Sequence, residues 1–171
     1  MRVLVTAASK HGGTMEIAEA IGDALTMCGV DAVVVPVADA RDVATFDAIV
    51  LGSAVYVGHW LPAAKEFVTQ HVEELRHRPV WLFSSGPIGD PPMPADPPVD
   101  VAPMFDVTGA VEHRVFAGRL DRHRLGFAER AMVAALRAPT GDYRDWDDIR
   151  GWGRSIASVL GSAAAASGPP A

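Results

Sequence analysis

The six residues from Ser9 to Thr14 have the types and spacing of a site that binds a phosphate group. They follow a short apolar run and precede a segment with apolar residues at 17, 18, 21 and 25, which is helical spacing. A loop at a helix N-terminus presents unpaired backbone N–H groups and the positive end of the helix dipole, and these bind anions. The alternative is an ordinary turn in which Thr14 caps the helix. The residues of this first loop are Ser9, Lys10, His11, Gly12, Gly13 and Thr14.

The first loop matches neither of two common nucleotide-binding patterns. The sequence has no GxxxxGK followed by Ser or Thr at this place, and no GxGxxG between the expected strand and helix. The pattern that remains is S-x-x-G-x-T. It predicts that the hydroxyls of Ser9 and Thr14 join the backbone amides around a single terminal phosphate.

Two further loops of small residues also follow apolar, strand-like runs. Because the carboxyl ends of parallel strands meet at one edge of a sheet, we expect all three loops to surround one ligand. Tyr56 and Trp60 are expected to lie against a flat ligand or, alternatively, to pack within their own loop. The candidate ligand-binding residues are Ser53, Ala54, Val55, Tyr56, Val57 and Gly58 in the second loop, and Ser84, Ser85, Gly86, Pro87, Ile88 and Gly89 in the third.

The elements that must position these loops alternate between strands and helices. This alternation predicts an α/β fold with a five-stranded parallel sheet and right-handed crossovers. We expect one domain over residues 1–161 and a disordered tail over 162–171, which lacks side chains that could pack. A short helix is expected at 102–107, and Asp145 is expected to cap the last helix. The predicted strands are 3–5, 31–37, 47–51, 79–83 and 110–116, and the main predicted helices are 15–27, 62–76 and the segment after 145.

Composition and charge exclude several classes of function. The chain has 171 residues, 49% of them hydrophobic, and a net charge of −6, which argues against general nucleic-acid binding. No apolar run approaches the roughly 20 residues of a membrane span, so we expect a soluble, cytoplasmic protein. The lone Cys28 is expected to be a buried structural thiol. The six histidines show no pair at i, i+4 spacing on a helix, and we expect no metal site.

Two segments outside the loops also carry expectations. Residues 90–103 contain six prolines and are expected to form a rim or lid beside the third loop, or an inert surface excursion. Residues 117–137 combine arginines with a partly helical apolar pattern. Arg119, Arg122 and Arg124 are expected to steer an anionic substrate or contact a membrane surface, with peripheral membrane association as a consequence. The alternative is a core-packing helix with a solvated basic face.

Taken together, SKHGGT after the first strand, GSAVYVGHWLP after the third and SSGPIG after the fourth resemble the flavodoxin-like FMN proteins. Within this group the chain most resembles the menaquinone-dependent protoporphyrinogen oxidases and their actinobacterial flavodoxin-domain relatives. The segments FAGRLDRHRLGFAERAM and GDYRDWDDIR share in that resemblance, which covers roughly residues 1–160. It implies a flavodoxin-like three-layer sandwich with strand order 2-1-3-4-5.

The resemblance also implies FMN as the cofactor and assigns roles to the loops. In flavodoxins the first loop reads T-x-T-G-x-T and wraps the FMN phosphate. Ser9, Gly12 and Thr14 match it, whereas His11 stands where a hydroxyl residue is usual. The second and third loops fall where the family holds the isoalloxazine ring, and the third supplies no aromatic residue, which leaves one ring face open for a substrate.

Three functions follow from these expectations. The first is an FMN-dependent oxidoreductase that acts on a quinone-linked or tetrapyrrole-type substrate, with Trp60 and the three arginines near the substrate. The second is a nonenzymatic electron carrier that exchanges electrons with a redox partner. The third is a flavodoxin-fold protein that has lost its flavin. Because the basic segment is distant from the first loop along the chain, we expect reversal of its three arginines to spare flavin binding.

Overall fold

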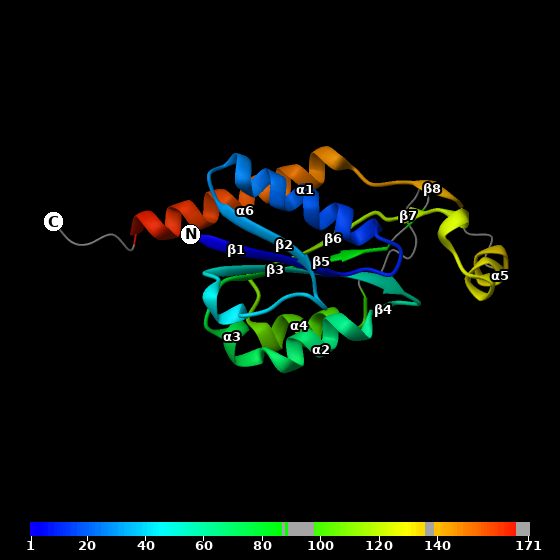
Figure 1. The fold of residues 1–171 in the computed structure, drawn as a ribbon, viewed down its shortest axis with the longest axis horizontal. Helices are drawn as coiled ribbons and strands as arrows, with labels where there is room; N and C mark the ends of the chain where they lie inside the picture. Colours follow the sequence, from blue (N-terminus) through cyan, green and yellow to red (C-terminus); the bar gives the residue numbers. More distant parts are fainter. Residues whose placement is uncertain (87, 89–97, 136–138, 167–171) are drawn as a thin grey trace.

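The computed structural model of the chain, which describes residues 1–86, 88, 98–135 and 139–166, has a parallel sheet with helices on both faces (Figure 1). The strand order is β2-β1-β3-β5-β6, with a short sixth strand, β4, antiparallel to β3. Leaving β4 aside, this order is the predicted 2-1-3-4-5. The strands are β1 (Arg2–Ala8), β2 (Asp31–Pro36), β3 (Ala48–Tyr56), β4 (His59–Trp60), β5 (Val80–Ser85) and β6 (Glu112–Phe116).

The helices form the two outer layers of the sandwich (Figure 1). The first and last helices cover one face of the sheet, and three shorter helices cover the other. The apolar runs of the strands are buried because they face both layers, which explains why they read as continuous rather than alternating. The helices are α1 (Gly13–Met27), α2 (Pro62–Gln70), α3 (Val72–Arg76), α4 (Val101–Thr108) and α6 (Trp146–Ala166).

Two hydrophobic cores lie on the two faces of the sheet. One joins β1, β3 and β5 to α1 and α6, and Trp152 is its largest fully buried side chain from a helix. There the rings of Phe83, Phe116 and Trp152 pack in tilted and edge-to-face arrangements, with centroids 5.6 to 6.2 Å apart. The other core joins the sheet to α2, α3 and α4 and includes Phe67 and Leu75. Because both faces of the sheet are packed against helices, the loops at the carboxyl ends of its strands start from fixed positions.

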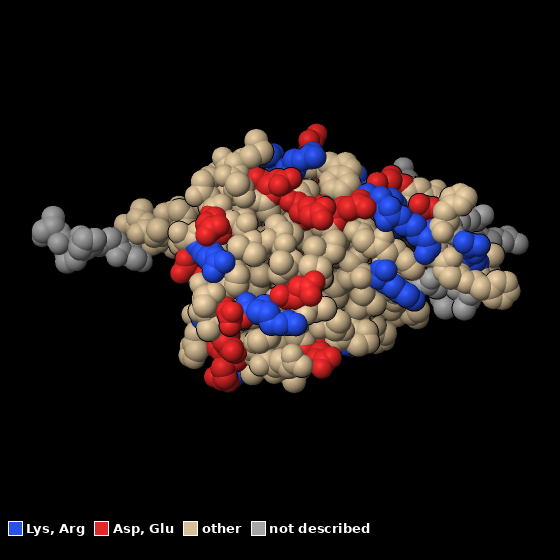
Figure 2. All heavy atoms as spheres, in the orientation of Figure 1, with Lys and Arg blue, Asp and Glu red and all other residues tan. Residues whose placement is uncertain are grey.

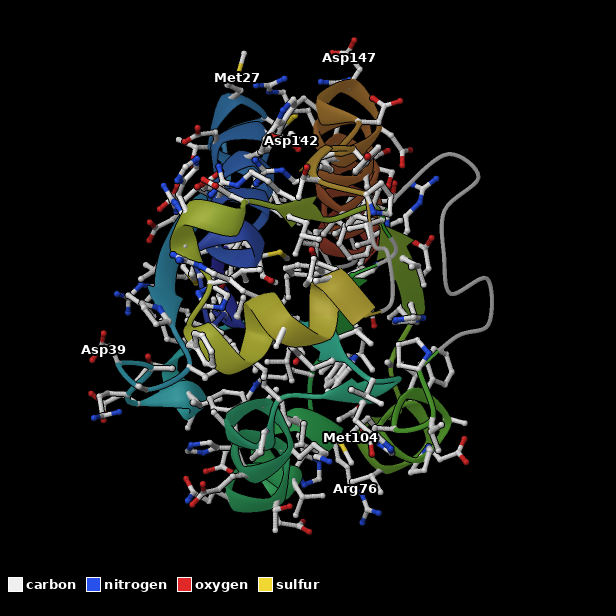
Figure 3. The ribbon with its side chains drawn as sticks, turned by 90° about the vertical axis from the view of Figure 1, so that its right-hand side faces the viewer. Met27, Asp39, Arg76, Met104, Asp142 and Asp147 are labelled. Atoms are coloured by element: carbon white, nitrogen blue, oxygen red, sulfur yellow. The ribbon has the colours of Figure 1, made fainter. Side chains whose placement is uncertain are left out.

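An excursion of the chain lies between β6 and α6. It contains β7 (Arg119–Leu120), a 3-10 turn η2 (Arg122–Arg124), α5 (Phe127–Ala135) and β8 (Gly141–Asp142), and β7 pairs with β8 in an antiparallel hairpin. Viewed from the carboxyl ends of the strands, α5 crosses in front of the sheet (Figure 3). The excursion therefore covers the edge at which the three candidate loops were expected to meet.

Several helix and strand ends confirm the sequence-based predictions. Gly29, with a φ of +82°, follows the end of α1. The carboxylate of Asp145 accepts hydrogen bonds from the N–H groups of Asp147 and Asp148, both at 3.0 Å, as a cap of α6. The short helix expected at 102–107 is α4, and the expected edge strand at 110–116 is β6.

Other boundaries differ from the predictions. The single helix expected at 62–76 is broken at His71 into α2 and α3. Disorder was expected from Ser162, but α6 continues to Ala166, because alanine is the best helix former and four alanines follow Ser162. Residues 167–171 lie outside the described residues. Cys28 is exposed rather than buried, because the last turn of α1 extends past the core and leaves Met27 88% exposed as well.

Candidate functional site

The first loop connects β1 to α1 at the carboxyl edge of the sheet, as predicted. Gly12 is the N-cap residue, with a φ of +84° that favours glycine. Its carbonyl accepts the first helical hydrogen bond, from the N–H of Glu16 at 3.0 Å. No side chain caps the helix, so the alternative role of Thr14 as a cap is wrong. The N–H groups of the first turn therefore face the loop without a side-chain acceptor, as a phosphate-binding loop requires.

Thr14 lies in this first turn and is only 3% exposed. Its hydroxyl makes no hydrogen bond within the described residues. A threonine hydroxyl that is nearly buried and has no protein partner in this part of the chain fits a ligand oxygen. The uncapped N–H groups of α1 and the hydroxyl of Thr14 therefore form a set of donors that fits a phosphate group.

The second loop is shorter than the sequence indicated, because β3 continues through Tyr56. The chain then turns at Val57 and Gly58, both with positive φ (51° and 77°), and returns as β4. Two central residues with positive φ are typical of a tight hairpin. The turn leaves Val57 81% and Tyr56 37% exposed at the carboxyl edge. Lys10 of the first loop lies 5.7 Å from the centre of the Tyr56 ring, so the two loops meet.

Of the two alternatives for Trp60, the structure supports packing within the protein and not contact with a ligand. The hairpin turns it into the core, where it is 1% exposed and its indole N–H donates to Ser84 Oγ at 2.8 Å. Ser84 Oγ also lies 2.9 Å from Nε2 of His113. Ser53 is likewise fully buried, and its hydroxyl accepts from the N–H of Leu61 at 3.0 Å and donates to the carbonyl of Ala54 at 2.9 Å. These two hydroxyls hold the hairpin in place instead of facing a ligand.

Asp100 is a residue of this edge that sequence reasoning missed. Its carboxylate accepts from the backbone N–H of Trp60 at 2.8 Å and lies 3.2 Å from the His59 ring and 3.4 Å from Lys65. Burial acts to raise the pKa of Asp100, but the hydrogen bonds from Trp60 and His59 and the charge of Lys65 outweigh it and lower the pKa. Asp100 therefore fastens the hairpin to α4 as a carboxylate, a contact that a separation of 40 positions hides from sequence patterns.

The third loop is described only in part. Ser85 is buried, and the N–H of Gly86 donates to the carbonyl of Phe116 at 3.3 Å, which ties this loop to the end of β6. Ile88 is half-buried. Pro87 and Gly89 lie outside the described residues, as does most of the proline-rich segment expected to form a rim or lid.

The arginines of the excursion lie beside the first loop, not apart from it. Both guanidinium nitrogens of Arg119 bind the carboxylate of Glu16, at 3.0 and 2.9 Å. Arg124 donates to the carbonyl of His11 at 3.0 Å. The expectation that these residues are remote from the phosphate loop is therefore wrong, because distance along the chain hides the return of the excursion to the first loop and the start of α1. The Arg122 side chain lies outside what the structure describes.

Arg144 is a second residue that sequence reasoning missed. Its side chain is 1% exposed, and it binds the carbonyl of Gly13 at 3.0 Å, Glu16 at 2.8 Å and Asp142 at 2.6 and 2.8 Å. Burial acts to lower the pKa of Arg144, but its bonds to Asp142 and Glu16 raise it overall. The bonds from Arg144 likewise lower the pKa of Asp142, against the effect of burial. Both groups are therefore charged at neutral pH.

On the face seen in Figure 2, basic side chains gather at the end of the molecule that carries β7 and α5, and acidic ones gather over α1. An open cavity of about 420 Å³ lies at the β7–β8 hairpin and is lined by Arg119, Asp121 and His123, among others. Within the described residues no group of three or more His, Cys, Asp or Glu side chains is placed to hold a metal ion.

The fold and this edge define an α/β protein of the flavin-binding type. The chain belongs to the flavodoxin domain family, which matches residues 4–147. Membership implies FMN as the cofactor, and the geometry of the first loop fits its phosphate. A comparison with curated protein sequences finds no significant match. The described residues include no helix that is long and apolar enough to cross a membrane.

Solved structures share the fold. A flavodoxin from the domain Archaea has a TM-score of 0.67 at 18% identity and covers 94% of this chain and 99% of its own. The two-electron reduced flavodoxin of Megasphaera elsdenii has a TM-score of 0.62 at 19% identity, with coverage of 92% and 99%. The Flv1 flavodiiron core of Synechocystis has a TM-score of 0.67 at 14% identity, and the match covers 95% of this chain but 36% of that larger one.

Proposed function

We propose that the chain is an FMN-dependent oxidoreductase whose substrate is a small molecule of the quinone or porphyrinogen type. Bound FMN would supply one- and two-electron redox chemistry at the carboxyl edge. Ser9 to Thr14 would hold the phosphate, and the hairpin residues 54–58 with the third loop, 85–89, would hold the ring. Ser53 and Ser84, which were also expected at the ring, would not contact the flavin but would hold the β3–β4 hairpin in position through their hydrogen bonds.

The observation that carries this proposal is the position of α5 across the carboxyl edge (Figure 3). A protein that only carries electrons must bring the edge of its flavin close to a second protein. A helix in front of that edge would obstruct a large partner protein more than it would obstruct a small molecule. Tyr56 and Val57 are exposed at the same edge and offer apolar surface to a flat substrate.

The similarity to flavodoxins of nearly equal length favours the second candidate, a nonenzymatic electron carrier. The two candidate functions predict different electron acceptors, a small quinone for the oxidoreductase and a protein for the electron carrier. We would reduce the FMN-loaded protein anaerobically and mix it with a water-soluble menaquinone analogue or with cytochrome c in a stopped-flow instrument. Free reduced FMN at the same concentration is the control.

An oxidoreductase should reduce the quinone faster than free reduced FMN does and should reduce cytochrome c more slowly. Replacement of residues 126–138 by a Gly-Ser linker should reverse this preference, because it removes α5 from the edge. Fast reduction of cytochrome c by the intact protein, with no advantage over free FMN for the quinone, would favour the carrier and refute the proposal.

Contact with a membrane that holds the quinone also stays a proposal. Phe127 at the start of α5 is 92% exposed, and the neighbouring Arg124 and Arg130 are exposed as well. An exposed aromatic ring among cations suits an anionic membrane surface. Cosedimentation with vesicles that contain anionic lipid should fall for Phe127→Ser. Equal recovery of both proteins, or recovery of neither, would count against the contact.

A further inference from the structure

The carboxylate of Glu16 lies at the helix end where the phosphate of a bound flavin would lie, and two negative charges disfavour each other there. Glu16 lies in the first turn of α1, and its N–H bonds to the carbonyl of Gly12, the N-cap residue of the same loop. An acidic residue in the first turn stabilises an empty helix through the dipole. It would also repel a phosphate bound at the same helix end, because solvent screens partly buried like charges poorly. The charge of Glu16 must be compensated if the loop is to hold a phosphate.

Two arginines from the far end of the chain supply that compensation. Arg119 on β7 binds Glu16 with both ends of its guanidinium, and Arg144, just after β8, binds Oε2 of Glu16 at 2.8 Å. A planar guanidinium that binds a carboxylate through two parallel bonds is among the strongest charged pairs in proteins. The compensation comes from the β7–β8 hairpin, more than 100 residues away in sequence.

Arg144 is also held rigidly. Its side chain is 1% exposed, its guanidinium lies 4.3 Å from the centre of the Trp146 ring, and Asp142 binds it from the side opposite to the loop. Its Nη1 donates to the carbonyl of Gly13 as well as to Glu16. Asp142 is labelled in Figure 3, where it lies close to α1 and the start of α6. Arg144 therefore joins the first residue of α1 to the hairpin that carries the excursion.

We propose that Arg144, assisted by Arg119, is a positioning residue of the phosphate loop that neutralises Glu16 and makes phosphate binding depend on the β7–β8 hairpin. This inference rests on the proposed placement of the FMN phosphate at Ser9 to Thr14. It assigns to the excursion a role in cofactor affinity, in addition to any role in substrate access. The ligand class concerned is a flavin phosphate monoester, as distinct from a flavin without phosphate.

The test compares FMN with riboflavin, which lacks the phosphate, by fluorescence quenching on titration of the apoprotein. The variants are Arg144→Gln, Glu16→Gln and the double variant. Arg144→Gln should weaken FMN by about tenfold or more and riboflavin by less than about threefold, with a larger FMN loss at low salt. The double variant should recover most of the lost FMN affinity, because it removes the carboxylate that Arg119 alone then has to neutralise.

Arg150→Gln is the matched control. Arg150 also lies over the Trp146 ring, at 5.9 Å, but it is exposed, and its guanidinium donates to the carbonyl of Trp146 and not to the first loop. It should leave both affinities unchanged. If Arg144→Gln does not fold, as judged by its thermal transition, Arg119→Gln replaces it, since the Arg119 side chain is 21% exposed and more tolerant.

The titrations separate two claims, the positioning role of Arg144 and the placement of the FMN phosphate at the first loop. Equal losses of FMN and riboflavin in Arg144→Gln, with no recovery in the double variant, would mean that Arg144 is only structural and would overturn the inference. Wild-type protein that binds FMN and riboflavin equally would instead overturn the placement of the phosphate. A selective FMN loss that the double variant repairs supports both.

Discussion

Replacement of Thr14 by valine should separate the phosphate of FMN from its ring as sources of affinity. Valine keeps the shape of threonine and removes only the hydroxyl, which is nearly buried and makes no hydrogen bond within the described residues. A hydrogen bond to a charged group contributes about 1.5 to 3 kcal/mol. We therefore expect FMN affinity to fall by about tenfold to a hundredfold. Riboflavin affinity should stay the same, because riboflavin brings no charged oxygen to the loop.

The assay is fluorescence titration of the apoprotein with each flavin, for wild type, Thr14→Val and the control Thr26→Val. Thr26 is an exposed threonine near the other end of α1, so its replacement tests for a general effect on the helix. Stability should change by less than about 0.5 kcal/mol in Thr14→Val, because Thr14 does not cap the helix. Equal losses for both flavins, or no loss for either, would place Thr14 away from the phosphate and refute the reasoning.

Three further predictions test other parts of the structure. Gly52→Ala should destabilise the fold by about 1 to 3 kcal/mol in urea unfolding, because a Cβ there would lie 2.0 Å from the buried Phe83 ring; a loss below about 0.5 kcal/mol would mean that the ring packs elsewhere. Burial lowers the pKa of His113, although the charge of Glu112 acts to raise it, so the unfolded chain takes up this proton at a higher pH than the folded one. Stability should therefore decline as the pH falls below the ordinary histidine value of 6.5, and the urea midpoint of His113→Gln should decline less, whereas parallel curves would contradict the assignment. Cys28 is exposed and should react with a thiol reagent in the folded protein; reaction only after denaturation would contradict the observed end of α1.

The sheet could be predicted from the sequence because its central strands are buried on both faces. Residues 3–5, 32–35 and 48–51 are continuous apolar runs, and each lies in a strand of the predicted order. The predicted end of β3 is less accurate, because it depends on the backbone conformation of two neighbouring residues, Val57 and Gly58. The β3–β4 hairpin depends on a positive φ at Val57, a conformation that a β-branched residue rarely adopts, so the segment appeared to be a loop and Trp60 appeared to be available to a ligand.

The site could be predicted in outline for a similar reason. The first loop depends on residues that are adjacent in sequence, and the structure places them at the expected helix end. Glu16 and Arg144 are separated by 128 positions, and Arg119 and Glu16 by 103, so their contacts arise only when the excursion folds back to the start of α1. An arginine near the C-terminal helix carries no local signal of a partner in the first turn of α1. The assignment to the protoporphyrinogen oxidase branch depends on the weaker resemblance of the excursion and stays a prediction.

The most direct test of the whole account is the response of the purified apoprotein to FMN. Titration with FMN should quench the flavin fluorescence to saturation at one flavin per chain and shift the visible absorbance. Inorganic phosphate at concentrations far above that of FMN should weaken this binding by competing at Ser9 to Thr14. Riboflavin should bind less tightly and should not respond to phosphate. No quenching by either flavin would contradict the central claim that this edge of the sheet is an FMN site.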